Sequence, residues 1–116
     1  FLKGLPVDWQ GQMAGTRLFM THGKPGNNMW GLYSERVSPN VVDLMLDSLD
    51  ADVLITGHTH IPMCIRGDAR MIINPGSLYT FASQRPSSHT YGVLSVPDRR
   101  FWLYDLLGSA DDPLSL

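Results

Sequence analysis

Two short apolar runs, each followed by a histidine next to a glycine, limit most strongly what this chain can fold into. Residues 16–21 are followed by His22-Gly23, and residues 52–56 are followed by Gly57-His58. Both runs are continuous and rich in β-forming residues, which is typical of strands buried on both faces. The glycines let the chain turn sharply where each strand ends. The sequence therefore predicts two buried strands that each deliver a histidine at the carboxyl end.

The segment between these strands contains the clearest helix signal in the sequence. Ser38 suits the N-cap and Pro39 the first helical position, where the missing N–H is not needed. Four apolar residues then recur at the spacing of one helical face: Val42, Met45, Leu46 and Leu49. A strand–helix–strand unit brings the carboxyl ends of its two strands to the same edge of a sheet. We therefore expect an α/β fold.

The remaining segments give weaker signals. Residues 63–66 and 70–73 are expected to form one hairpin, and residues 91–96 and 100–106 a second, because short turn sequences separate them. Glycines and a proline interrupt the first fifteen residues, so we expect turns there and no strand. Residues 23–37 are expected to form a loop, and the C-terminal tail is expected to be frayed.

The composition is that of an ordinary globular protein. Of 116 residues, 43% are hydrophobic and 17% are charged, which suits a single domain. The net charge of −2 and the pI near 6.0 give no basic surface of the kind that nucleic-acid binders use. No apolar run is long enough to span a bilayer, and the single cysteine, Cys64, fits a reducing compartment. We therefore expect a cytoplasmic protein without a membrane contact or a strong nucleic-acid contact.

Three of the four histidines stand at or just after the predicted strand ends. His22 and His58 follow the two strands, and His60 stands two residues further along. Neutral imidazoles that converge at a sheet edge form a site for a first-row transition metal, with zinc, manganese and iron all plausible. The alternative is that each is an ordinary polar residue at a strand end, as we expect for His89 in its polar loop. Three histidines beside glycine-flanked strand ends favour the metal site.

Four short motifs occur in the order Thr21-His22-Gly23, Gly57-His58-Thr59-His60 with Ile61-Pro62, Asn74-Pro75-Gly76-Ser77 and Tyr91-Gly92-Val93-Leu94. In order and spacing they resemble the calcineurin-like metallophosphoesterases, especially the small bacterial and archaeal phosphodiesterase branch, over roughly residues 5 to 105. The resemblance implies a four-layer αββα sandwich with two divalent metal ions between its sheets. Manganese is favoured, with iron, zinc, nickel and cobalt as alternatives. It also implies that His22 and His58 bind one ion and that His60 binds the other.

The same resemblance implies that half of the site lies outside this sequence. The family's Asp-x-His, its Gly-Asp-x-x-Asp and its Gly-Asn-His-Asp/Glu, which carries the protonating histidine, do not occur in these 116 residues. Without the bridging carboxylate, three histidines cannot hold two cations about 3.5–4 Å apart. We therefore expect residues 1–116 to be a single partial domain, the C-terminal half of the sandwich, which is inactive alone and requires the N-terminal half. No catalytic residue is expected within it.

The implied function is metal-dependent hydrolysis of phosphate mono- or diesters, with a phosphate-ester small molecule or a nucleotide as substrate. Five candidates for substrate binding lie near the predicted edge: Gly23, Lys24, Arg36, Asn74 and Gly76. Lys24 and Arg36 could bind phosphate oxygens, although exposed loop cations are usually only solvated. Trp30 and Tyr33 could stack on a leaving group or simply pack in their loop.

The rival function is a non-catalytic scaffold on the same fold, of the kind that a retromer subunit provides. The three histidines favour the enzyme, because a scaffold has no chemical need for them. The sequence leaves a homo-oligomer open.

Overall fold

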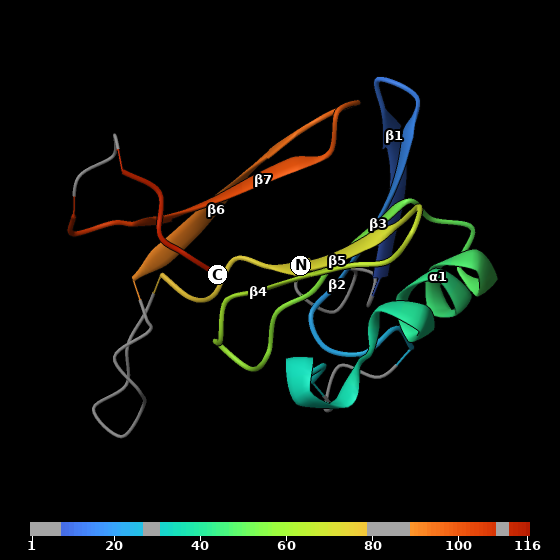
Figure 1. Ribbon diagram of the computed structural model, residues 1–116, viewed down its shortest axis with the longest axis horizontal. Helices are drawn as coiled ribbons and strands as arrows, with labels where there is room; N and C mark the ends of the chain where they lie inside the picture. Colours follow the sequence, from blue (N-terminus) through green and yellow to red (C-terminus); the bar gives the residue numbers. More distant parts are fainter. Residues whose placement is uncertain (1–7, 27–30, 79–88, 109–111) are drawn as a thin grey trace, which may run out of the picture.

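The computed structural model describes residues 8–26, 31–78, 89–108 and 112–116 (Figure 1). Within these residues, five strands form one mixed sheet in the order β1-β2-β3-β5-β4, and β6 and β7 form a separate two-stranded sheet. The elements in chain order are β1 (Asp8–Met13), β2 (Thr16–Thr21), a 3-10 helix (Ser34–Arg36), α1 (Pro39–Ser48), β3 (Val53–Ile55), β4 (Met63–Arg66), β5 (Met71–Asn74), β6 (Thr90–Ser95) and β7 (Arg100–Asp105). The predicted α/β fold class is confirmed.

The centre of the five-stranded sheet consists of parallel strands. β2 pairs with β3 in parallel, with Leu18 opposite Val53, and β3 pairs with β5 in parallel, with Val53 opposite Met71. α1 begins at Pro39, as the sequence predicts, and Ser38 occupies the N-cap without a side-chain capping hydrogen bond. Because β2, β3 and β5 are parallel, their carboxyl ends lie at one edge of the sheet, where binding sites form in α/β folds.

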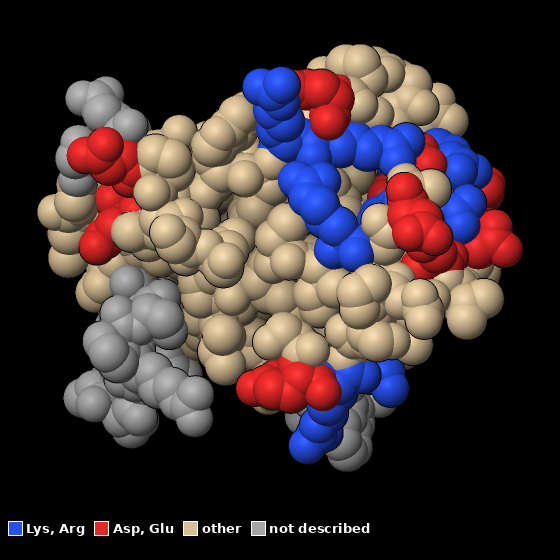
Figure 2. All heavy atoms as spheres, in the orientation of Figure 1, with Lys and Arg blue, Asp and Glu red and all other residues tan. Residues whose placement is uncertain are grey.

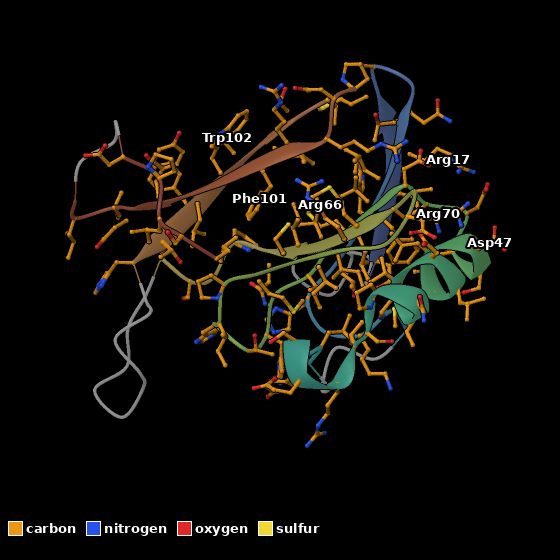
Figure 3. The ribbon with its side chains drawn as sticks, viewed as in Figure 1. Arg17, Asp47, Arg66, Arg70, Phe101 and Trp102 are labelled. Carbon is orange, nitrogen blue, oxygen red and sulfur yellow. The ribbon has the colours of Figure 1, made fainter. Side chains whose placement is uncertain are left out.

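Different elements cover the two faces of the sheet, and they lie on opposite sides of it in Figure 1. On one face, Val42 and Leu46 of α1 are both 0% exposed. On the other face, Leu94 and Phe101 of the β6–β7 hairpin pack against the sheet. Figure 3 shows Phe101 directed from β7 toward the sheet and Trp102 on the other face of the strand. The central strands are therefore buried from both sides, as their continuous apolar runs predict.

The expectation that no strand forms before residue 16 is wrong. β1 pairs antiparallel with β2, with Asp8 opposite Thr21 and Met13 opposite Thr16. The turn between them is Ala14-Gly15, and both residues adopt positive φ, at 49° and 76°. A two-residue turn with two positive φ angles matches the twist of an antiparallel pair, and β2 supplies the hydrogen bonds that β1 needs. The sequence signals this strand only weakly, because Gly11 separates the two apolar residues, Trp9 and Met13, and the strand is mostly exposed.

Two further expectations need correction. The 23–37 segment contains the 3-10 helix Ser34–Arg36, and the tail is partly fixed because the Leu114 N–H donates to the Leu103 carbonyl at 2.7 Å.

Both predicted hairpins are confirmed, with their strand ends shifted by at most about a residue. Trp30 lies outside the described residues. Among the described helices, none is long and apolar enough to cross a bilayer.

Candidate metal centre

Direct hydrogen bonds join the carboxyl ends of β2 and β3. The Gly57 N–H donates to the His22 carbonyl at 2.8 Å, and the Thr56 hydroxyl donates to the Gly23 carbonyl at 2.6 Å. A Cβ on Gly57 would lie 3.3 Å from the His22 carbonyl oxygen, which is a tight contact. Glycine therefore allows the two strand ends to approach closely. This contact brings the two sequence motifs together in space.

The imidazoles of His22 and His58 meet at this junction. The His58 Nδ1 lies 3.3 Å from the His22 Nε2, and the rings are perpendicular with centroids 5.2 Å apart. Two nitrogens that bind one tetrahedral ion at roughly 2.0–2.1 Å lie roughly 3.3–3.4 Å apart. The separation also fits a hydrogen bond between one protonated and one unprotonated ring nitrogen. The separation of the two ring nitrogens is therefore compatible with the binding of one divalent ion by both imidazoles.

The loop after β3 has an unusual backbone conformation. His58 and His60 have φ of 66° and 60°, in the left-handed region that residues other than glycine adopt uncommonly. The Thr59 N–H donates to the Gly57 carbonyl at 2.8 Å, and the Ile61 N–H donates to the Thr59 hydroxyl at 3.2 Å. Such conformations cost about 1–3 kcal/mol each and persist where surrounding contacts impose them. His58 and His60 are candidate ligands two positions apart, and the positive φ that they share points to a functional loop.

The structure brings His22 and His58 together and places His60 on the same loop, two residues further on. Within the residues that the structure describes, no three His, Cys, Asp or Glu side chains lie close enough together to hold a metal ion. The described residues therefore bring two histidines together and do not form a complete metal centre. The assignment of His22, His58 and His60 to metal ions stays a prediction.

Asn74 and Gly76 serve the site in a way that differs from the predicted substrate contact. Asn74, the last residue of β5, is 0% exposed. Its amide donates to the Gly57 carbonyl at 3.2 Å and to the Thr59 hydroxyl at 3.1 Å, and its oxygen accepts from the Gly76 N–H at 2.9 Å. The Asn74 side chain and the Gly76 N–H are therefore engaged within the protein. Direct substrate contact through them would require these bonds to break, so the structure makes them supports of the loop.

Lys24 and Arg36 line one cleft. Its volume is about 330 Å³, and its lining also includes Tyr33 and apolar residues of the 31–45 segment. The Arg36 guanidinium lies 5.8 Å from the centroid of the Tyr33 ring. Gly31, which also lines the cleft, is so close to His58 that an added Cβ would lie 3.2 Å from its imidazole. Lys24 and Arg36 therefore line a cleft beside the 57–60 loop.

The opposite edge of the sheet carries a network of ion pairs that was not predicted from the sequence. The Asp52 carboxylate accepts hydrogen bonds from the Arg17 backbone at 2.8 Å and from its guanidinium at 3.0 Å, and lies 3.5 Å from the Arg99 guanidinium. These contacts, led by the side-chain hydrogen bond from Arg17, lower the pKa of Asp52 to about 2. Arg70 pairs with Asp47 at 3.3 Å. Figure 3 shows Arg17, Arg70 and Asp47 on the same side of the molecule, and Figure 2 shows positive and negative side chains gathered on that side.

Comparison with known proteins identifies the family. A sequence profile of the calcineurin-like phosphoesterase superfamily domain matches residues 2–99. The chain belongs to the calcineurin-like phosphoesterase superfamily. Members of this superfamily are generally phosphoesterases that bind divalent metal ions, and the family resemblance read from the motifs is confirmed. No curated protein matches the chain.

Solved structures of the superfamily share the fold at low identity. A hypothetical protein from Pyrococcus horikoshii matches with a TM-score of 0.73 at 14% identity, over 95% of this chain and 44% of that one. Wild-type Vps29 from Entamoeba histolytica, solved with zinc, matches with a TM-score of 0.65 at 23% identity, over 92% and 58%. An archaeal phosphodiesterase matches with a TM-score of 0.56 at 22% identity, over 84% and 50%. The present chain thus spans about half the length of the structures it matches.

Proposed function

We propose that this chain forms the C-terminal half of a metal-dependent phosphoesterase. The convergence of the His22 and His58 ring nitrogens, 3.3 Å apart at the joined ends of β2 and β3, carries the proposal. In this assignment His22 and His58 bind one divalent ion, and His60 contributes to a second. Manganese is favoured, with iron, zinc, nickel or cobalt as alternatives. The reaction is hydrolysis of a phosphate mono- or diester.

Bound divalent ions would polarise the phosphoryl oxygens and lower the pKa of the attacking water. The chain's own residues hold the ligands for this task. Gly57 and Thr56 fix the two strand ends against each other, which aligns the two imidazoles without any charged group between them. In the adjoining cleft, Lys24 and Arg36 supply positive charge for the ester's phosphate oxygens, and Tyr33 supplies an aromatic surface for its organic group.

The partial-domain assignment of residues 1–116 belongs to this proposal. On the face that the β6–β7 hairpin covers, Trp9 and Met20 stay 46% and 44% exposed and lie opposite each other on β1 and β2. Exposed apolar pairs of this kind suit a surface that packs against further protein. We propose that the N-terminal half packs here and supplies the remaining metal ligands and the protonating histidine. The cleft and the histidine pair would then be completed by the same segment.

The test uses the intact protein that contains this chain. His58→Ala should lower both its metal content and its hydrolysis of a chromogenic phosphodiester. Loss of an outer contact to a metal ligand alone costs roughly 10- to 100-fold in affinity or activity, so loss of the ligand should cost at least that. His89→Ala, outside the proposed site, serves as the matched control and should stay within a few-fold of the parent.

Two outcomes would contradict the proposal. Equal turnover of His58→Ala and the parent, at equal metal content, would show that the histidine pair does no chemistry. If the parent shows no turnover with manganese, nickel, cobalt, iron or zinc but binds a protein partner, the scaffold function stands instead. Vps29 structures, which share the fold, make that second outcome worth measuring directly.

A further inference from the structure

We propose that Asn74 is a positioning residue that holds the 57–60 loop in its metal-binding conformation; this inference rests on the proposed function. Asn74 lies at the carboxyl end of β5, beside the end of β3 in the parallel sheet. Its amide reaches across to the loop at two points, the Gly57 carbonyl and the Thr59 hydroxyl. These two points stand on either side of His58 in the chain. Asn74 therefore brackets the residue whose ring meets His22.

The chemistry of the position requires an amide side chain. Asparagine offers two N–H donors and a carbonyl acceptor on one short, flat group. Here the amide nitrogen donates twice and the amide oxygen accepts once. Both donors point to the loop, while the oxygen accepts the Gly76 N–H of the following turn. Leucine has the same branching pattern, although it is larger, and can make none of these bonds. Because Asn74 is fully buried, water has no access to replace a lost partner.

The loop needs such a restraint. His58 and His60 are held at positive φ, a conformation that non-glycine residues leave when nothing opposes it. The Asn74 bonds fix the carbonyl immediately before His58 and the side chain immediately after it. Rotation of the His58 backbone to negative φ would carry one of these two groups away from the amide. The buried amide thus selects the backbone conformation that directs the His58 ring to His22.

The simpler explanation is that Asn74 only stabilises the Asn74–Gly76 turn. Thr90 provides the matched comparison, because it is also buried, at 5% exposed, and its hydroxyl donates to the Pro75 carbonyl of the same turn at 2.8 Å. Thr90 is the first residue of β6, and its hydroxyl donates to the turn rather than to the 57–60 loop. A purely structural contribution should therefore be shared by the two residues. A positioning contribution should belong to Asn74 alone.

The experiment measures Co²⁺ binding to the intact protein by titration calorimetry and by the visible absorption of the bound ion. Asn74→Leu should weaken Co²⁺ binding roughly 10- to 100-fold, the usual effect of removing a partner behind a metal ligand, and should change the absorption band. Thr90→Val should lower the melting temperature but leave the Co²⁺ affinity within a few-fold of the parent. Thr59→Val keeps the Asn74 bond to the Gly57 carbonyl but removes the hydroxyl that accepts from both Asn74 and the Ile61 N–H, so it should also weaken Co²⁺ binding. It serves as the second variant if Asn74→Leu does not fold.

An affinity of Asn74→Leu or Thr59→Val equal to that of the parent would overturn the inference. A loss of Co²⁺ affinity in Thr90→Val as large as the loss in Asn74→Leu would also overturn it, because the stability of the turn would then explain both losses. His58→Ala separates this failure from failure of the proposed function. If His58→Ala binds Co²⁺ as well as the parent, the metal site itself is wrong. If His58→Ala loses binding while Asn74→Leu keeps it, only the positioning role falls.

Discussion

Replacement of Asp52 by asparagine tests whether the ion pair at the amino edge of the sheet stabilises the fold. The Asp52 carboxylate accepts bonds from the backbone and the guanidinium of Arg17, at 2.8 and 3.0 Å, and its side chain is only 12% exposed. Asparagine keeps the shape and one acceptor oxygen but removes the negative charge. The change therefore isolates the charged component of these contacts.

The size of the effect follows from the pKa. The pKa of Asp52 falls from 3.8 to about 2 in the folded protein, chiefly because the Arg17 side chain bonds the charged form. This difference corresponds to about 2 kcal/mol of stability, at about 1.4 kcal/mol per pKa unit. Because the folded pKa is the lower one, this stability is fully present above pH 4 to 5 and is lost as the pH falls through 2.

Urea denaturation of the parent and of Asp52→Asn at several pH values measures the difference in free energy of unfolding. It should be about 2 kcal/mol at pH 6 and should shrink to about 0.5 kcal/mol at pH 2. Asp112→Asn, at an exposed site in the tail, is the control and should follow the parent at every pH. A difference between Asp52→Asn and the parent that stays constant with pH would refute the reasoning, since the charge would then not be its source.

Two further predictions concern packing and backbone conformation. Leu46→Ala, at a 0% exposed position of α1, should lower the free energy of unfolding by about 2–5 kcal/mol, whereas Leu44→Ala, at a 73% exposed position, should change it by less than about 0.5 kcal/mol. Equal losses in urea denaturation would contradict the packing of α1. Gly76→Ala should lower the melting temperature more than Gly15→Ala: both glycines have positive φ, but only at Gly76 would the new Cβ meet an atom, Thr90 Oγ1 at 2.0 Å. A similar melting temperature for both variants would show that the turn relaxes freely.

The parts of the fold that the sequence predicted are those fixed by local signals. Pro39 and the apolar face through Val42 and Leu46 are sufficient to define α1, because helix periodicity and the N-terminal position of proline act within a few residues. The continuous apolar runs of β2 and β3 indicate burial on both faces wherever the strands lie in the sheet. His22 and His58 could be paired from the sequence because both follow such strands.

The parts that sequence reasoning missed depend on distant partners. In β1, Trp9 and Met13 alternate with polar residues, but Gly11 interrupts this apolar face, and the strand is held by its pairing with β2. Arg17 and Asp52 are 35 positions apart and meet only after β2 and β3 pair. Asn74 reads as a turn residue in the chain, and its bonds to the loop exist only because β5 lies beside β3. The left-handed φ of His58 and His60 leaves no mark in residue type, since glycine or asparagine is the usual occupant of that region.

The two edges of the sheet hold their side chains by different physical means, and this difference bears on the missing half of the site. At the amino edge, charged contacts such as Arg17–Asp52 fix the strands. At the carboxyl edge, neutral bonds from Thr56, Gly57 and Asn74 do so, and they leave no carboxylate within the described part of the histidine cluster. Neutral imidazoles bind a divalent ion without offsetting its charge. A pair of ions held at this edge would therefore need anionic ligands from elsewhere, which is the contribution we assign to the N-terminal half and, during turnover, to the phosphate of the substrate.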